Sequence, residues 1–263
     1  MIYCNLKGDL GNILFQIATS KSLAIDNNTD YSLPNLISHL NYLDSDNTYN
    51  PNLKHSFEYL KLFKSLNHTP INSKFKSLIF PFEFIDVGKI NEDVLIDGFF
   101  QSEKYFKHNR NHILDMINFD FELDKKYNFL KEEKKTTSIH VRRGDYLKFP
   151  NHHPIQTLNY YLDSIDILKD DTDLFVIFSD DINWCKENLK LDNIIYIENE
   201  KDYIELYLMS ICTNHIISNS SFSWWGAWLN RNENKKVIGP LVWFGSEITY
   251  PTNDILPKNW IKI

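Results

Sequence analysis

The second half of this 263-residue chain alternates between short apolar segments and longer segments in which apolar residues recur at helical spacing. Five short segments have the apolar and β-branched composition of buried strands: 138–141, 174–178, 194–197, 215–218 and 237–239. The segments between them predict helices over 155–168, 182–189, 202–213 and 222–231. Connections of this length join parallel strands, so the alternation predicts a doubly wound α/β sheet.

The first half opens with a similar unit. Residues 2–6 predict a buried strand, residues 7–12 a tight turn with glycines, and residues 15–25 a helix. Glycine lets backbone amides approach an anion at a helix N-terminus, so this unit can hold a ligand. A purely structural turn explains the glycines equally well.

The rest of the first half is less regular. Residues 27–76 are polar and without a clear period, apart from a helix predicted over 53–66. A strand is predicted over 94–100, and it precedes a helix that begins near Lys104. No chemistry can be assigned to the irregular stretch from its sequence.

A charged run at 131–135, with the sequence KEEKK, has the composition of a solvated connector. It marks the expected boundary between two domains, residues 1–135 and residues 136–263. The chain is long enough for two hydrophobic cores. The sequence therefore predicts an α/β protein with two Rossmann-like domains that face each other across a cleft.

The overall charge and cysteine content exclude several classes of protein. A net charge of −7 argues against a nucleic-acid-binding surface, which needs a basic stripe. Cys4, Cys185 and Cys212 are too few and too scattered for a disulfide framework or a zinc cluster, so buried reduced thiols are expected. The first residues do not resemble a signal peptide, and no apolar run reaches membrane-spanning length. We expect a cytoplasmic protein, either soluble or attached peripherally to the membrane.

Two of the four arginines are adjacent, in residues 140–145 with the sequence HVRRGD. They follow the predicted strand at its carboxyl end, where open α/β sheets bind ligands. A guanidinium group binds phosphate through two hydrogen bonds at once, which lysine cannot do. Alternation along the strand places His140 and Arg142 on one face and Arg143 on the other, so Arg142 is the candidate phosphate ligand. The alternative is a surface ion pair between Arg143 and Asp145.

Polar clusters follow two other predicted strands. Asp180 and Asp181 could bind a metal, but a helix cap before residue 182 is the favoured interpretation. Residues 218–223, with the sequence SNSSFS, offer hydroxyl groups and free amides to a phosphate, whereas a simple cap would need only one serine. Trp224 and Trp225, which follow, are expected in the core rather than under a sugar.

Two further features carry alternative interpretations. Glu205 could accept two hydrogen bonds from the edge of a guanine, or it could be a solvated helix residue. His152 and His153 are adjacent, so they are expected in a loop before a helix that starts at Pro154 rather than as two ligands of one metal.

Together these motifs resemble those of the α1,2-fucosyltransferases, inverting enzymes that use GDP-fucose. Residues 140–145 resemble the motif H-x-R-R-x-D of that family, residues 178–181 its F-S-D-D, and residues 218–229 its serine-rich segment. Residues 98–106 and 254–260 are also similar. The N-terminal turn resembles G-G-L-G-N-Q, with Asp9 in place of a glycine and Ile13 in place of the glutamine.

The resemblance implies a GT-B-like fold with two domains. Residues 1–135 would form the acceptor-side domain, and residues 136–263 would bind GDP-fucose. The donor would be GDP-β-L-fucose, and the acceptor the 2-hydroxyl of a terminal galactose on an oligosaccharide or polysaccharide. Neither a metal nor a cofactor is expected, because fixed donors can neutralise the departing diphosphate in place of a cation.

The resemblance also suggests roles for individual residues. The residues expected at the reacting centre are His140, Arg142 and Asp145. Those expected to bind GDP-fucose are Gly11, Asn12, His140, Arg142, Asp180, Glu205, Asn219, Ser220, Ser221 and Phe222. Arg142 would bind the β-phosphate, while Asp145 is a candidate general base or an orienting partner of Arg143. A late deprotonation of the acceptor would make a strong base unnecessary.

Three other functions remain open. Another GDP-sugar transferase with a different acceptor would share these motifs. A non-catalytic glycan-binding protein would explain the six tryptophans, and it would bind glycans without binding GDP. A Rossmann oxidoreductase is disfavoured because residues 8–11 lack the spacing G-x-G-x-x-G.

Overall fold

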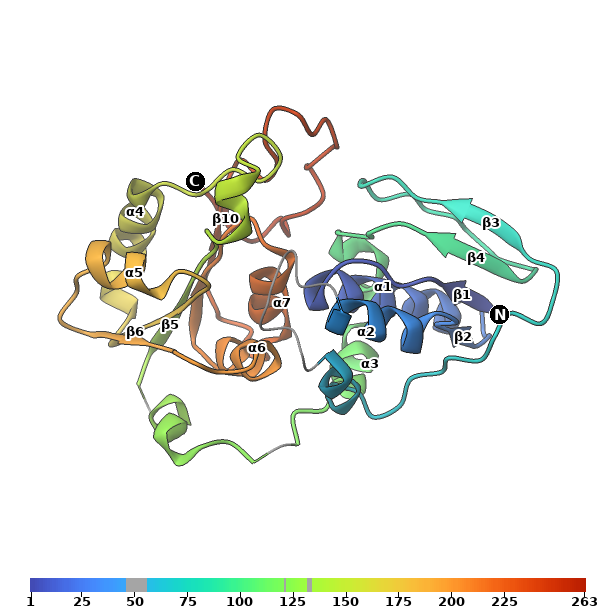
Figure 1. Ribbon diagram of the computed structural model, residues 1–263, viewed down its shortest axis with the longest axis horizontal. Helices are drawn as coiled ribbons and strands as arrows, with labels where there is room; N and C mark the ends of the chain where they lie inside the picture. Colours follow the sequence, from blue (N-terminus) through green and yellow to red (C-terminus); the bar gives the residue numbers. More distant parts are fainter. Residues whose placement is uncertain (46–55, 121, 132–133) are drawn as a thin grey trace. The chain divides into compact units, whose positions relative to one another are not determined.

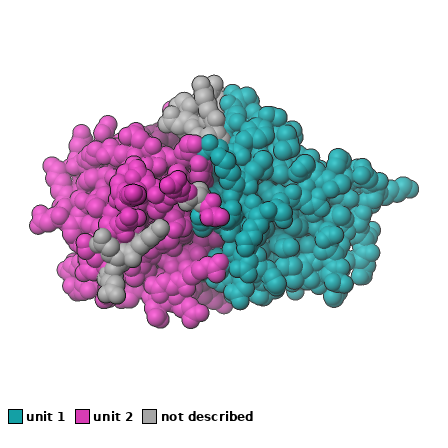
Figure 2. Space-filling view, turned by 90° about the horizontal axis from the view of Figure 1, so that it is seen from below, with its two compact units in different colours: residues 1–119, 250–257 teal, residues 120–249, 258–263 magenta. Residues whose placement is uncertain are grey.

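The computed structural model describes residues 1–263 except 46–55, 121 and 132–133. The chain forms two compact units, which Figure 2 shows in different colours. Unit 1 consists of residues 1–119 and 250–257, and unit 2 of residues 120–249 and 258–263. Each unit contains its own parallel sheet.

These units differ from the expected ranges 1–135 and 136–263 at two places. The 3-10 helix η4 (Lys125–Lys131) belongs to unit 2, because Tyr127 and Leu130 are buried in the same hydrophobic cluster as Val176 and Phe178. Residues 250–257 belong to unit 1, where Tyr250 stacks on the ring of Phe82. Unit 2 thus begins at Asp120, before the charged run that was expected to mark the boundary.

The sheet of unit 1 has the strand order β2-β1-β4-β3 (Figure 1). Its strands are β1 (Ile2–Cys4), β2 (Tyr31–Ser32), β3 (Lys76–Ile79) and β4 (Val94–Asp97). Its helices are α1 (Leu10–Asp26), α2 (Leu36–Ser45), α3 (Arg110–Met116) and the 3-10 helices η1 (Ser56–Leu62), η2 (Glu103–Tyr105) and η3 (Lys107–Asn109). Central strand β1 is buried throughout, as its apolar sequence predicts.

Several predictions for unit 1 need correction. Helix α1 begins at Leu10, so Gly11 and Asn12 lie in its first turn and not in the preceding loop. The stretch 27–76 contains β2 and α2, which were not predicted. Of the helix predicted over 53–66, residues 53–55 lie outside the described residues, and 56–62 form a 3-10 helix. The helix expected near Lys104 is a short 3-10 turn, and α3 starts at Arg110.

Unit 2 has a six-stranded sheet with the order β10-β9-β8-β5-β6-β7. Its strands are β5 (Thr136–Val141), β6 (Leu174–Ser179), β7 (Ile194–Tyr196), β8 (Asn214–Ile216), β9 (Val237–Gly239) and β10 (Ile261–Lys262). Its α-helices are α4 (Leu158–Leu168), α5 (Ile182–Asn188), α6 (Asp202–Ser210) and α7 (Ser221–Leu229), and its remaining 3-10 helices are η5 (Asp145–Lys148) and η6 (Lys169–Asp171). All of its strand pairings are parallel.

The core of unit 2 lies on both faces of this sheet. Helices α4 and α5 contribute Tyr161 and Cys185 to a cluster with Ile139 of β5. On the other face, Leu208 of α6 packs in a cluster with Phe178 of β6. Figure 1 shows α4 and α5 on one side of β5 and β6, and α6 and α7 on the other. The predicted doubly wound sheet is therefore confirmed.

Helix α7 carries the tryptophans predicted in the core. Trp224, Trp225 and Trp228 are buried, and the ring of Trp224 also contacts that of Trp260. Gly226 lies against α6, where an added Cβ would approach Met209 Cβ to 2.9 Å. The glycine therefore permits close contact between the two helices. No helix in the described parts of the chain is long and apolar enough to cross a membrane.

A buried histidine links β8 to its neighbours. His215 Nδ1 lies 2.8 Å from Ser138 Oγ, and the side-chain amide of Asn230 donates to His215 Nε2 over 2.8 Å. Burial, followed by the charge of Lys235, lowers the pKa of His215 to about 3. The imidazole is therefore neutral in the folded protein at physiological pH.

This histidine predicts that acid destabilises the fold. The unfolded chain takes up a proton near pH 6.5 and the folded chain does not, so the free energy of unfolding falls as the pH drops below that value, by up to about 1.4 kcal/mol per pH unit. Guanidinium denaturation between pH 7 and pH 4 measures this slope. His215→Asn should have a shallower slope than the wild type, and an unchanged slope would assign the effect to other groups.

Candidate functional site

Three polar segments meet at one edge of the sheet in unit 2. Strands β8, β5 and β6 are neighbours and parallel, so their carboxyl ends lie at the same edge. The segments that follow these strands are 217–223, 142–148 and 180–181. The predicted site residues of unit 2 other than His140 and Glu205 come from these segments.

Arg142 is held by two carboxylates. Its guanidinium lies 2.6 Å from Asp145 Oδ1 and 3.1 Å from Asp180 Oδ2, and it lies over the ring of Tyr146 at 5.5 Å. The 3-10 helix η5 starts at Asp145 and directs this side chain back to Arg142. A planar group fixed in this way loses little conformational entropy when it binds an anion.

Arg143 has different partners. Its Nε lies 3.0 Å from Asp181 Oδ2, and its guanidinium lies 4.3 Å from the centre of the Trp184 ring. The proposed pair of Arg143 with Asp145 is therefore wrong, because Asp145 binds Arg142. Separate partners for the two arginines agree with the predicted alternation of faces.

The two aspartates after β6 have distinct structural roles. Asp181 caps α5, accepting a hydrogen bond from the backbone amide of Trp184 over 3.2 Å, which confirms the capping interpretation. Asp180 accepts from the backbone amide of Arg143 over 2.8 Å. An added Cβ at Gly144 would lie 2.6 Å from Asp180 Oδ2, so glycine permits this close approach. Within the residues described, no group of three or more His, Cys, Asp or Glu side chains is placed to hold a metal ion.

His140 is buried next to the serine-rich segment. Its Nδ1 lies 2.9 Å from Ser218 Oγ, and its ring lies 5.6 Å from that of Phe222. Burial, followed by the charge of Arg142, lowers the pKa of His140 to about 3. Its imidazole is therefore neutral at physiological pH, and it can position neighbouring groups by hydrogen bonding and packing without carrying a positive charge.

The serine-rich segment places the start of α7 at this edge. Ser220 is the N-cap but makes no side-chain capping bond, and the first helical hydrogen bond runs from the Trp224 amide to the Ser220 carbonyl over 3.0 Å. The amides of the first turn, those of Ser221 and Phe222 among them, have no acceptor within the helix. Together with the helix dipole, these amides favour an anion.

Asn219 supports the loop below this helix. Its side-chain nitrogen donates to the carbonyls of Pro154 and Trp243, each over 3.0 Å, and its side-chain oxygen accepts from Gln156 over 3.0 Å. These bonds engage both ends of the amide, so the side chain fixes the loop. Helix α4 starts at Leu158 and not at Pro154, which leaves His152 and His153 in the predicted loop.

Glu205 lies on α6 and is partly buried. Burial raises the pKa of this carboxyl well above its usual range, and the charges of Asp202, Glu200 and Asp180 act in the same direction. Asp180, one of these three acidic residues, follows β6 at the sheet edge. A partly buried carboxyl with a raised pKa near such an edge is a candidate ligand-binding group.

The predicted residues of unit 1 lie at the start of α1. Gly8 has a φ of +75°, and an added Cβ there would approach the Asn12 side chain to 2.4 Å. Asn12 Oδ1 accepts from the side-chain amide of Gln101 over 2.8 Å. Gly11 is buried in the first turn of the helix. Sequence reasoning did not single out Gln101 individually, although it lies in the similar segment 98–106.

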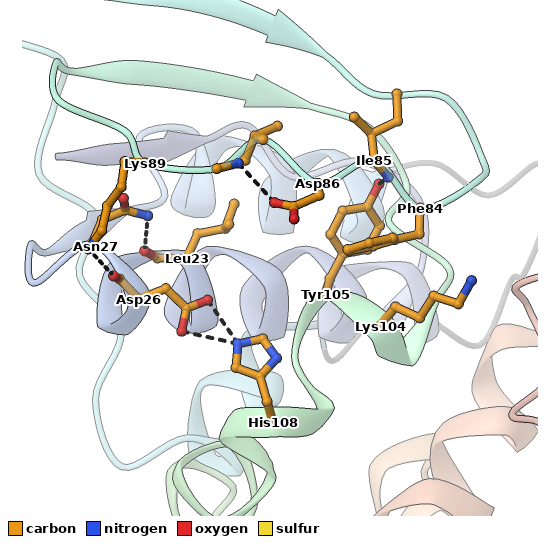
Figure 3. Close-up of a pocket in the computed structure, with 12 residues that line it drawn as sticks. Leu23, Asp26, Asn27, Phe84, Ile85, Asp86, Lys89, Lys104, Tyr105 and His108 are labelled. Carbon is orange, nitrogen blue, oxygen red and sulfur yellow. Dashed lines mark hydrogen bonds and ion pairs between the residues drawn. The ribbon is translucent and has the colours of Figure 1, made fainter.

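Unit 1 also contains a cavity of about 440 Å³ beside the carboxyl end of α1 (Figure 3). The carboxylate of Asp26 there lies 2.9 Å from His108 Nε2, and Lys89 Nζ donates to the Asp26 carbonyl over 3.3 Å. None of the site residues predicted from the sequence lines this cavity.

Comparison with solved structures supports the fold class. Fucosyltransferase NodZ from Bradyrhizobium has a TM-score of 0.53 at 12% identity, covering 86% of this chain and 91% of that protein. Crystals of NodZ α-1,6-fucosyltransferase grown with GDP give a TM-score of 0.54, also at 12% identity, and cover 86% and 91% of the two chains. At this identity the similarity shows the GT-B-like α/β fold alone.

Sequence comparison is more specific. An α-1,2-colitosyltransferase of Escherichia coli is 31% identical over 100% of this chain and 99% of its own length. The O-antigen biosynthesis glycosyltransferase WbnK of Escherichia coli is 32% identical over 69% of this chain and 65% of its own length. The model of glycosyl transferase family 11 matches residues 1–263. The chain therefore belongs to glycosyl transferase family 11.

Proposed function

We propose that this glycosyltransferase moves L-fucose from GDP-β-L-fucose to the 2-hydroxyl of a terminal galactose, with inversion and without a metal. The observation that carries the proposal is the anchored guanidinium of Arg142 at the same sheet edge as the start of α7. The 1,2 linkage is supported by the colitosyltransferase relative, and a GDP-sugar donor by the NodZ structures with GDP and GDP-fucose.

The donor would bind mainly to unit 2. Arg142 would bind the β-phosphate, and the amides of Ser221 and Phe222 would donate to the diphosphate, with the Ser220 hydroxyl beside them. Glu205 would accept hydrogen bonds from the two N–H groups on the guanine edge. Ionising this partly buried carboxyl has a cost, which two charge-assisted hydrogen bonds from the base would offset.

The chemistry is a displacement at the anomeric carbon. The bond from C1 of fucose to the β-phosphate oxygen breaks while the acceptor 2-oxygen forms a bond to C1 on the opposite face. Negative charge grows on the diphosphate during this step, and Arg142 stabilises it most strongly when separation is advanced. The acceptor proton then passes to solvent or to the buffer.

The structure favours an orienting role for Asp145. Its carboxylate is engaged by Arg142 at 2.6 Å, and proton uptake would weaken that ion pair. Neutral His140 packs beside Phe222 and holds Ser218, which positions the segment leading into α7. Asn12 in unit 1 remains a proposed contact to the fucose or its phosphate. The reaction needs no strong general base when the acceptor hydroxyl loses its proton late, after the bond to GDP has largely broken.

A second donor deserves a direct comparison because the relative similar over the full chain is named as a colitosyltransferase. Colitose is L-fucose without its 3-hydroxyl group. A pocket built to hydrogen-bond that hydroxyl discriminates strongly against its absence, whereas an apolar pocket discriminates weakly. The two donors differ only at this hydroxyl group, so an assay that compares them measures the donor preference of the site directly.

The proposed activity predicts a defined product. Incubation with GDP-fucose and lactose in the presence of EDTA should release GDP and give a fucosyl-lactose, whose 1,2 linkage and α configuration NMR can establish. GDP-colitose assayed in parallel measures donor preference as a ratio of kcat/KM. Loss of turnover in EDTA, restored by Mg²⁺, would contradict the metal-independent mechanism. If the enzyme used GDP-colitose and not GDP-fucose, the transferred sugar would be colitose and the proposed donor would be wrong.

Arg142→Lys should fold normally and lose turnover by roughly 10²–10³-fold, because a point charge cannot reproduce the two-donor fork. The matched control is Arg231→Lys, an exposed arginine outside the site, and it should retain wild-type turnover. Circular dichroism confirms the fold, and initial rates measure kcat. Normal turnover by Arg142→Lys would show that this residue has no part in the mechanism.

A thermal-shift measurement with GDP tests the alternative function. A protein that binds glycans but shows no thermal shift with GDP would be a non-catalytic glycan-binding protein.

A further inference from the structure

Aromatic side chains gather where the neighbouring strands β3 and β4 of unit 1 end. Phe82 follows β3 and Phe99 follows β4, and their ring centres lie 5.3 Å apart. Tyr250 stacks on Phe82 with ring centres 4.1 Å apart and planes 13° apart. Tyr250 is 48% exposed, and Phe82 and Phe99 are partly exposed. We call these three side chains the aromatic platform.

A buried aromatic cluster is adjacent to the platform residues in the sequence. Phe80 and Phe100 are buried with ring centres 5.0 Å apart, and Tyr105 contacts both rings. An added Cβ at Gly98 would lie 2.9 Å from Phe80 Cβ, so the backbone approaches this cluster closely.

The backbone between Phe99 and Gln101 is strained. Phe100 has a φ of +52°, which bulky residues rarely adopt, and strain of this kind is concentrated at ligand-binding and active sites. The strand predicted over 94–100 ends at Asp97, before this residue. The positive φ lets the consecutive side chains differ in environment, with Phe99 partly exposed and Phe100 fully buried.

Polar groups border the platform. Lys7, paired with Asp97, lies over the ring of Phe99 at 4.9 Å from its centre. Gln101 donates to Asn12, while its side-chain oxygen is buried and has no hydrogen-bond partner among the residues that the structure describes. A buried carbonyl oxygen without a donor is unfavourable, and a ligand hydroxyl is a group that could satisfy it after a small shift.

We propose that the aromatic platform binds a pyranose ring of the acceptor glycan by stacking, with Lys7, Asp97 and Gln101 as hydrogen-bonding groups for its hydroxyls. One face of a galactose ring carries the C–H groups of C3, C4 and C5, which pack on the electron-rich face of an aromatic ring. Its hydroxyl groups project from the rim and need both donors and acceptors. The combination of rings with a bordering cation, anion and amide provides both.

The inference rests on the proposed function in one respect, because it takes the glycan to be the acceptor. It assigns acceptor recognition to Phe82, Phe99 and Tyr250, which the sequence motifs had not singled out for binding. A sugar fits this surface better than a protein partner does, since a stable protein interface needs roughly 800 Å² on each side. Three partly exposed rings bordered by charges match the size of a single sugar unit.

Tyr250→Ala removes the most exposed ring and tests the platform. The KM for lactose should rise by about 5–10-fold, the scale of one lost aromatic contact, while the KM for GDP-fucose stays within twofold. Tyr250→Phe keeps the ring and should restore the wild-type KM. Phe99→Ala should act in the same direction as Tyr250→Ala.

The matched control is Phe75→Ala, which removes a ring of 43% exposure immediately before β3, at the opposite end of that strand. It should leave the KM for lactose unchanged. An unchanged lactose KM in Tyr250→Ala would overturn the platform, as would an equal rise in Phe75→Ala.

A binding measurement separates failure of the platform from failure of the proposed function. Saturation-transfer NMR with lactose and GDP needs no turnover, and it should show the strongest transfer to galactose H3, H4 and H5. Loss of this transfer in Tyr250→Ala would support the platform even if GDP-fucose is not the donor. Transfer that persists in Tyr250→Ala, or no transfer in the wild type, would contradict the platform independently of fucosyl transfer.

Discussion

The site in unit 2 depends on the ion pairs that fix Arg142. A guanidinium on a flexible side chain would lose rotamer freedom when it bound a diphosphate, and Asp145 and Asp180 remove much of that freedom in advance. Asp145 comes from η5, three residues after Arg142, whereas Asp180 is available because β5 and β6 are neighbours and parallel, so that their polar segments begin at the same edge. Gly144 then lets Asp180 approach the backbone.

Each unit has its own parallel sheet, and different kinds of side chain follow the carboxyl ends of the strands in the two sheets. In unit 2 the strand ends carry a guanidinium held by two carboxylates and the start of α7, which suit a charged nucleotide. In unit 1 the strand ends carry aromatic rings bordered by single polar groups, which suit a neutral sugar. The division of charged and aromatic surfaces agrees with a donor bound by one unit and an acceptor bound by the other.

The sequence predicted the strands of unit 2 closely, because strands buried on both faces leave continuous apolar runs such as 174–178. Arg142 was singled out from the sequence because paired arginines at a strand end are unusual in a lysine-rich chain, and its role in binding stays a prediction. The partner of Asp145 could not be predicted, because it depends on the 3-10 turn η5. Helix α2 was missed although Leu36, Leu40 and Leu43 have helical spacing, since polar residues surround them.

Long-range features were beyond sequence reasoning. The stacking of Tyr250 on Phe82 joins residues far apart in the chain, and no local pattern records it. The same holds for the return of residues 250–257 to unit 1, which a single boundary in the sequence cannot represent. The positive φ of Phe100 likewise could not be predicted from the sequence, because it is known only from the backbone conformation.

The most direct measurement is a crystal structure of the protein with GDP. The account predicts that β-phosphate oxygens lie within about 3 Å of the Arg142 guanidinium and that the diphosphate meets the first-turn amides of α7. It also predicts the guanine edge against Glu205. A well-occupied GDP whose diphosphate lies away from Arg142 and from the start of α7 would contradict the account.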